Sequence, residues 1–370
     1  MKKSFWAIIL ILITVMILPD ISEAQSNKYR RKRGASKARR YKGGKNRATG
    51  RFRPYAFVGA SLNAGNYFGD LAPVNKAAST DISFTRPGFG FFVGSKVTPN
   101  ISLVTQLNWV RLIGSDFSSD PFGETTDAAR YSRNLSFRND LIELSVIGVY
   151  DIIKNVGSSN RRVAFTPYVY LGVGVFYHNP KGKVPDFDTH NPDYNVNDPI
   201  SSPESARFDN AGDWVALRPF GTEGQNIAGT GVSPYSLWQI NIPFGVGVRL
   251  RLPNNFDASI EFGPRKLFTD YIDDVSGEYI SIDRYSDPLA RAFVERSIEN
   301  IDVVTGEPRN MAAVASIAGG FRIENDVRFR SSFGSEGDIR GNPDDNDLYF
   351  VTQIKLSYIF NGTRRTAKFR

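Results

Sequence analysis

The sequence lacks several residue types on which common functions depend. It has no cysteine and only two histidines, His178 and His190. Without cysteine the chain can form neither a disulfide framework nor a lipid-anchoring cysteine, and two histidines leave little material for general acid–base catalysis. No long segment repeats apolar residues at a helical period, so the body of the chain is not expected to be helical.

Residues 1–24 have the pattern of a secretory signal peptide. Two lysines at positions 2–3 precede the apolar run Phe5–Leu18, and small residues stand at both ends of Ser22–Ala24. The run is shorter than a membrane-spanning helix needs, which disfavours the alternative of an uncleaved anchor. We therefore expect an exported chain whose mature form begins near Gln25.

Residues 25–53, which we call the basic arm, contain thirteen lysines and arginines and no acidic residue. The charges that precede the arm cancel, so subtracting these thirteen from the formal charge of +8 leaves −5 for residues 54–370. Like-charge repulsion and few apolar side chains predict a disordered, periplasmic segment. Its candidate partner-binding residues are Arg30, Arg31, Lys32, Arg33, Lys37, Arg39, Arg40 and Lys42.

The partner of such an arm must be anionic. An exported chain rarely meets nucleic acid, so acidic glycans, lipid phosphates or an acidic protein are the expected partners. The alternative is a solvated leader that only precedes the fold.

The stretch Trp238–Leu252 shows the dominant pattern of the body. Every even-numbered position in it is apolar, while the odd positions include Gln239, Asn241, Arg249 and Arg251. Strict alternation is typical of a β-strand with one apolar and one polar face, and this one is about three times the usual length of a soluble strand.

Eight segments of this kind recur, at residues 53–69, 87–97, 101–113, 135–151, 163–178, 238–252, 256–268 and 348–360. Short connections alternate with long ones of roughly 20, 20, 60 and 80 residues. Outer-membrane barrels place short turns at one end and long loops at the other, whereas the alternative, a secreted β-sandwich, has no reason to do so. A short helix is expected within residues 287–301, packed over the mouth of the barrel.

We therefore predict an all-β fold: an eight-stranded antiparallel transmembrane β-barrel over residues 54–360, with long extracellular loops. Both termini, including a basic C-terminal tail at 361–370, should be periplasmic. The apolar faces should contact outer-membrane lipid, while polar side chains fill a lumen too narrow for a pore. The predicted lumen residues are Gln106, Asn108, Arg249, Arg251 and Glu261. Pro167 and Pro243 cannot donate to the strand ladder, so we expect a local bulge at each.

Few residues suggest chemistry. His178 could be oriented by Asp186 or Asp188 in an enzyme of the outer rim, but no nucleophile stands at a matching spacing. The acidic clusters at 270–278 and 344–347 could hold calcium, although EF-hand spacing is absent and solvated loop charge is the usual outcome. We predict no catalytic residue, no metal site, no cofactor and no small-molecule substrate.

Four stretches resemble the PorG-like outer-membrane barrels associated with the type IX, gliding-linked secretion system. These are "GNYFGDL" (65–71), "SFRNDLIELSVIGVYD" (136–151), "LFTDYIDDVSGEYI" (267–280) and "IRGNPDDNDLYFVTQIKLSYIF" (339–360). The resemblance covers about residues 54–360, and its motif residues are Asp270, Asp273, Asp274, Arg340, Gly341 and Asn342. It implies a non-enzymatic barrel whose secretion-system members associate with a periplasmic ring of a lipoprotein and its partner.

This chain departs from the family pattern in its basic arm, its enlarged loop at 179–237 and the ten residues after Phe360. The leading hypothesis is an outer-membrane barrel that anchors or organises a periplasmic assembly, with secretion-system ring proteins as partners. The alternatives are a structural barrel that tethers the outer membrane to anionic peptidoglycan and a lipid-modifying enzyme at the outer rim.

Overall fold

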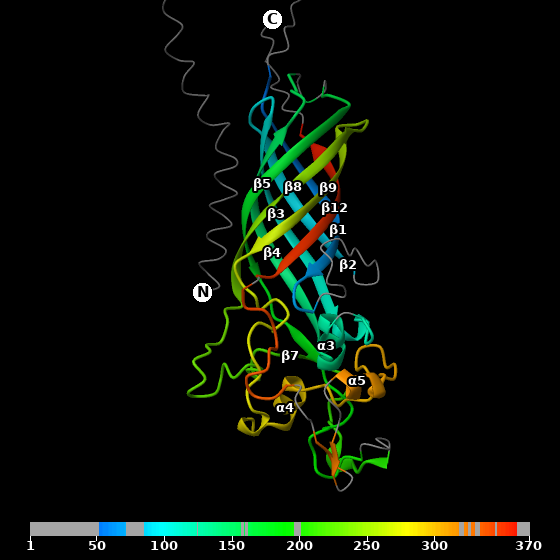
Figure 1. The fold of residues 1–370 in the computed structure, drawn as a ribbon. Coiled ribbons are helices and arrows are strands. Elements are labelled where there is room, and N and C mark those ends of the chain that lie inside the picture. Colours follow the sequence, from blue (N-terminus) through cyan, green and yellow to red (C-terminus); the bar gives the residue numbers. More distant parts are fainter. Residues whose placement is uncertain are drawn as a thin grey trace, which may run out of the picture.

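The structure, a computed structural model, describes residues 52–71, 85–123, 125–156, 159, 162–195, 201–317, 322–324, 327–329, 334–344 and 346–360. The predicted signal peptide, nearly all of the basic arm and the C-terminal tail lie outside the described residues. Eight long strands form the body (Figure 1): β1 (Tyr55–Phe68), β2 (Arg86–Lys96), β3 (Ile101–Ser115), β4 (Ser136–Asp151), β5 (Phe165–Tyr177), β8 (Trp238–Arg251), β9 (Phe256–Leu267) and β12 (Leu348–Ile359). Each lies within two residues of its predicted bounds.

These strands close into a barrel. Each pairs antiparallel with the next in the order β1, β2, β3, β4, β5, β8, β9, β12, and β12 pairs back onto β1 with Phe57 opposite Ile359. A closed sheet leaves no unpaired edge, which is the only way in which strands can satisfy their backbone polar groups inside a bilayer. The predicted fold class, an eight-stranded antiparallel barrel, is confirmed.

The two faces of each strand differ as the alternation requires. On β3 the outward row includes Ile101, Leu103 and Leu107, which are exposed, whereas Gln106 and Asn108 between them are buried. On β8 the even-numbered row is likewise the outward one, with Ile240 60% and Val246 56% exposed. The outer wall is therefore apolar and the interior polar, the reverse of a soluble barrel.

Neither proline introduces the expected bulge. Pro167 stays in the ladder opposite Val248. Near Pro243 the pairing of β8 with β5 stops at Phe244 and resumes at Asn241 in the same register, so no residue has been inserted. The chain accommodates the missing donor by interrupting the ladder rather than by shifting it.

The connections segregate to the two ends of the barrel. The short ones, residues 97–100, 152–164 and 252–255, lie at the end where β1 starts and β12 finishes, which we call the turn end. The long ones, residues 69–85, 116–135, 178–237 and 268–347, lie at the opposite loop end and carry small elements of their own (Figure 1). Those elements are η2 (Asp116–Ser118), α3 (Thr125–Arg133), β6 (Lys181–Lys183), η5 (Glu204–Ala206), β7 (Trp214–Ala216), η6 (Ile282–Arg284), α4 (Pro288–Val294), α5 (Met311–Ile317), β10 (Arg322–Glu324) and β11 (Val327–Phe329).

The expected helix in the last loop is α4. Asp287 caps it by accepting a hydrogen bond from the backbone N–H of Leu289, and Pro288 occupies the first turn, where its missing donor is harmless. Phe293 packs against Leu217 and Val184 of the preceding loop. The helix thus joins two long loops beyond the loop end of the barrel (Figure 1). Among the described residues, no helix is both long and apolar enough to cross a membrane.

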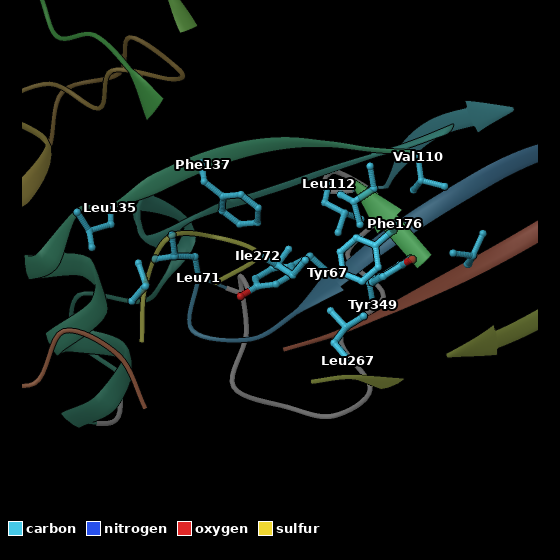
Figure 2. Close-up of a cluster of buried hydrophobic side chains, with 13 residues drawn as sticks. Tyr67, Leu71, Val110, Leu112, Leu135, Phe137, Phe176, Leu267, Ile272 and Tyr349 are labelled. Carbon is cyan, nitrogen blue, oxygen red and sulfur yellow. The ribbon is translucent and has the colours of Figure 1, made fainter. Parts of the chain in front are cut away.

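An apolar cluster seals the barrel where the loops begin (Figure 2). Tyr67, Leu112 and Phe137 come from three strands, and Ile272 enters from the long loop after β9. All four are buried, and the Tyr67 and Phe137 rings meet edge to face with centroids 4.9 Å apart. The long loops therefore pack against this cluster at the loop end of the barrel.

Candidate functional site

Three of the predicted lumen residues lie in one buried network. Lys355 on β12 donates from Nζ to Glu261 Oε2 at 2.6 Å and to Gln106 Oε1 at 2.7 Å. Asn108, one inward position along β3, accepts a hydrogen bond from Gln353. Since the lumen excludes bulk water, these polar groups must satisfy one another across it.

A second ion pair lies nearer the loop end. Glu143 on β4 receives hydrogen bonds from Asn241 Nδ2 at 2.7 Å and Tyr349 Oη at 2.9 Å, and its Oε2 lies 3.4 Å from Arg265 Nε. Both Glu143 and Arg265 are almost fully buried. Sequence analysis did not single out either residue, although both occupy inward positions that strand alternation assigns to the lumen.

The remaining predicted lumen residues lie toward the turn end. Arg249 reaches Asp151 at 3.2 Å, and Lys96 binds the same carboxylate at 2.5 Å. Arg251, by contrast, is exposed at the turn-end rim, where it donates to the carbonyl oxygen of Arg162. Arg251 is therefore not buried in the lumen, because it is the last residue of β8 and lies at the rim of the barrel.

The four stretches that carry the family resemblance converge at the loop end. Tyr67 and Asp70 come from the first, the loop 268–280 from the third and Arg340 from the fourth, and the second contributes Asn139, which donates to the carbonyl of Ile272 at 2.7 Å. Residues of the four stretches therefore meet in space, although Tyr67 and Asp347, for example, are 280 positions apart in the chain. We call this site the mouth cluster; it comprises Tyr67, Asp70, Glu223, residues 270–277, Arg340, Gly341, Asn342 and Asp347.

Arg340 bonds to several segments of the mouth cluster at once. It is buried, and its Nη1 donates to Glu223 Oε1 at 2.9 Å and to the carbonyl of Asp274 at 2.6 Å. Glu223 Oε1 also accepts the backbone N–H groups of Ser276 and Gly277 at 2.8 and 3.1 Å. One guanidinium thus ties the loop 178–237 to two distant segments of the loop 268–347.

Gly341 and Asn342 pack the same segment against β1. A Cβ on Gly341 would lie 2.5 Å from Asp70 Oδ2 and 2.7 Å from the backbone nitrogen of Ser276, so only glycine fits. The backbone N–H of Asn342 donates to Asp70 Oδ2 at 2.9 Å. Arg133 then binds the carbonyls of Asp70 and Arg340 from the side of α3.

Tyr67 connects two acidic residues that sequence analysis treated as parts of separate clusters. Its hydroxyl lies 2.7 Å from Asp273 Oδ2 and 2.6 Å from Asp347 Oδ1. A hydroxyl carries one hydrogen, so it can donate to only one carboxylate. The second contact is a hydrogen bond only if the other carboxyl is protonated and donates to the hydroxyl. The geometry therefore favours a bound proton on one of the two carboxyls.

The electrostatics of the cluster favour the same proton. Burial raises the pKa of Asp347 to about 7, and burial followed by the nearby charge of Asp347 raises the pKa of Asp270 to about 8. The same two causes raise the pKa of Asp273 well above its ordinary value. Asp274 is buried as well, but the charge of Arg340 opposes the effect and its pKa rises only to about 6.

The cluster is held by dense local bonding. Asp274 adopts the left-handed conformation with φ of 70°, which Asp tolerates better than most residues, and its carboxylate accepts from Thr222 and Tyr235 at 2.6 and 2.5 Å. The Oδ2 atom of Asp270 is buried without a hydrogen-bond partner, which costs less free energy when the carboxyl is neutral than when it is charged. Among the described residues, no group of three or more His, Cys, Asp or Glu side chains is arranged as a metal site.

His178 does not have the surroundings of a catalytic base. It is fully buried, its ring stacks on Tyr235, and its Nε2 lies 3.0 Å from the carbonyl oxygen of Ser236. Burial lowers the pKa of His178 to about 4, so the ring is neutral. Asp188, one of the two acids considered as its orienting group, lies 3.8 Å from Arg291. His178 packs between loops and faces no nucleophile.

Comparisons with known proteins add little to this geometry. No family model and no curated protein matches the chain. Among solved structures, it is similar to Neisserial surface protein A (8% identity, 82% of this chain and 97% of that one, TM-score 0.30). It is also similar to a major outer membrane protein of Thermus thermophilus (12% identity, 82% of this chain and 99% of that one, TM-score 0.32).

At these scores the matches carry no argument, and the class of the protein follows from its own strands. A closed barrel of eight strands, with an apolar outer wall and a polar, hydrogen-bonded interior, is an outer-membrane β-barrel. The chain is an outer-membrane β-barrel protein.

Proposed function

We propose that the protein is a non-catalytic outer-membrane anchor that holds a periplasmic assembly through its basic arm and its basic tail. The loop end faces outward and the turn end faces the periplasm, as short turns and long loops are distributed in barrels of this class. The mouth cluster keeps the long loops folded over the outer end, while recognition occurs at the other.

The observation that carries the proposal is where the two basic segments are attached. The arm precedes β1 and the tail follows β12, and these strands are paired, with Phe57 opposite Ile359 at the turn end. The attachment points of the arm, with its thirteen positive charges, and of the tail, with Arg364, Arg365, Lys368 and Arg370, therefore lie side by side. A flexible chain as long as the arm would span roughly 30 Å, enough to engage a partner beneath the inner leaflet.

The polar lumen supports anchoring over transport. The ion pair Arg265–Glu143 joins β9 to β4 across the interior, and the hydrogen bond from Lys355 to Gln106 joins β12 to β3. Any solute that passed through would have to break both. The resemblance to PorG-like barrels supports the ring proteins of the type IX secretion system as the partner.

Deleting residues 26–51 should leave the barrel inserted but release the periplasmic partner. Binding through such an arm is mostly Coulombic, so high salt should have the same effect as the deletion. A pull-down of the tagged protein from detergent, across a salt series, measures both. The matched control is an arm of the same composition in scrambled order, which should retain binding if charge alone suffices. If the truncated barrel keeps the same partners at every salt concentration, the arm is only a leader.

A second candidate, a tether to anionic peptidoglycan, is favoured by the same charges. Peptidoglycan fragments in the pull-down would support it, whereas co-purified ring proteins would support the first candidate. The experiment therefore decides between the two as well as testing the arm.

Orientation is tested with single cysteines, because the chain has none of its own. Ser205 is exposed in the loop that contains η5, and Lys154 is exposed in the turn between β4 and β5. On whole cells, an impermeant maleimide should label Ser205→Cys and spare Lys154→Cys. The opposite labelling would reverse the orientation.

A further inference from the structure

A cavity of about 480 Å³ lies on the outer face of the barrel, at the loop end of β2, β3 and β4. Its floor is the outward row of these strands, including Trp109, Arg111 and Arg138. Trp214 of β7 and Thr305 of the last long loop cover its outer side. It belongs neither to the mouth cluster nor to the lumen, because its floor residues point away from the barrel axis.

The cavity is cationic. Arg86, Arg111 and Arg138 line it. The neighbouring acids include Asp140, which Arg111 binds with two hydrogen bonds of 2.6 and 3.0 Å, and Asp302, which accepts hydrogen bonds from Thr305. Across the ladder from Arg138 stands Lys181 of β6. Arg138 and Lys181 therefore add positive charge that no ion pair with these carboxylates neutralises.

The guanidinium of Arg138 is fixed in position by an aromatic ring. Its guanidinium lies over the Trp214 ring, 4.5 Å from the ring centroid, and its Nε is buried without a hydrogen-bond partner. Stacking fixes the plane of a guanidinium and leaves its N–H edge available. A planar array of donors held at the edge of a cavity matches the oxygen atoms of a phosphate.

Below the arginines the same face is apolar and wide. Phe89 and Trp109 pack together with ring centroids 5.2 Å apart, and Phe91, Leu107 and Ile142 continue the surface toward the middle of the wall. Phe91 is 61% exposed and Ile142 48%. Aromatic rings at this level form the interfacial belt of a membrane barrel, so the arginines stand at the height of lipid headgroups.

We propose that this cavity binds the phosphate of a phosphorylated glycolipid of the outer leaflet, with the acyl chains lying along Phe89, Phe91 and Leu107. The assignment rests on the orientation given under the proposed function, since the loop end must face outward. A soluble anion would use only the arginines. The continuous apolar surface beneath them is what a lipid adds.

The test uses the full-length protein in detergent micelles and native mass spectrometry, with bisphosphorylated lipid A as the probe. The Arg86→Gln/Arg138→Gln double variant removes two cations and leaves the Arg111–Asp140 pair intact. Its affinity for lipid A should fall at least about tenfold, equivalent to about 1.4 kcal/mol. The matched control is Lys266→Gln, an exposed cation at the loop end of β9, on the opposite side of the barrel.

Two further binding measurements define the ligand. Dephosphorylated lipid A should bind the native protein as weakly as intact lipid A binds the double variant. Inorganic phosphate alone should not displace intact lipid A at equal concentration. Retained heat-modifiability on a gel shows that each variant is folded, and a salt series on the native protein, in which affinity should fall, tests the site without any variant.

Equal affinity of the double variant and the native protein would overturn the proposal. So would an equal loss in Lys266→Gln, which would show that only net charge matters. Displacement by inorganic phosphate would show that the site binds anions in general and is not a lipid site. Because lipid A binding is measured without a periplasmic partner, deletion of residues 26–51 should leave it unchanged. Failure of the anchoring proposal is thereby distinguished from failure of this one.

Discussion

The barrel lumen and the mouth cluster both bury charged residues, but they neutralise them differently. In the lumen each buried carboxylate faces a cation: Glu261 binds Lys355, Glu143 binds Arg265, and Asp151 binds Lys96. In the mouth cluster, Asp273 and Asp347 share a tyrosine hydroxyl instead. The lumen is neutralised by ion pairs, whereas the mouth has one such pair, Arg340–Glu223, and holds its other buried acids with protons.

This difference follows from where each region lies. Strands fix the lumen side chains across a narrow, rigid interior, so ion pairs of fixed geometry form there. The mouth is built from loops, and its buried acids outnumber the arginines that reach them, Arg133 and Arg340. A buried charge without a partner is expensive, so the acids bind protons. The wall should therefore resist changes of pH, while the attachment of the loops should respond to them.

The largest expected effect comes from breaking a lumen pair. Arg265→Met leaves Glu143 buried without its cation, and this should lower the free energy of unfolding by about 3–5 kcal/mol. Urea unfolding in lipid vesicles, followed by tryptophan fluorescence, measures the change. The double variant Glu143→Gln/Arg265→Met removes both charges and should recover most of the loss. A single variant as stable as the native barrel would show that the pair does not neutralise the lumen.

A charge on the outer wall tests the same contrast between interior and surroundings. Val246→Arg places a cation on the lipid face of β8 and should destabilise the barrel by about 2–4 kcal/mol. The matched control, Leu252→Arg at the turn-end rim, should lose no more than about 1 kcal/mol. A substitution on the inward face of β8, such as Gly247→Ser, is not a suitable control, because an added Cβ would lie 2.5 Å from the Tyr168 ring. Equal losses at Val246 and Leu252 would mean that this face does not contact lipid.

The sequence predicts the wall far better than the mouth, and the reason is physical. Lipid outside and polar groups inside impose a two-residue alternation that can be read locally, so strand bounds and lumen positions such as Gln106 and Glu261 follow from it. The acids at 270–274 were expected to be solvated loop charge. They are buried because Tyr67 contacts Asp273 from 206 positions away, a separation that no local pattern records.

The smallest effect should be the pH dependence of the mouth cluster. Its acids have raised pKa values in the folded protein, about 7 for Asp347 and about 8 for Asp270, against 3.8 unfolded. The folded state therefore holds the protons more tightly, and the stability they contribute is complete below about pH 4 and is lost as pH rises toward 8. Hydrogen exchange of the backbone amides of Ile272 and Val275, which donate to Asp347 and Asp273, reports this directly once corrected for the intrinsic effect of pH.

Asp273→Asn removes one of the competing negative charges and keeps an oxygen for the Val275 amide. Protection at pH 8 should then exceed that of the native protein, and its dependence on pH should become shallower. The exposed Asp209→Asn variant, which removes a charge of the same sign from another loop, should behave like the native protein. Protection that rises with pH in the native protein would contradict the shared proton. In that case the mouth would be neutralised, like the lumen, by cations, with Arg133 and Arg340 as the only described candidates bonded to the cluster.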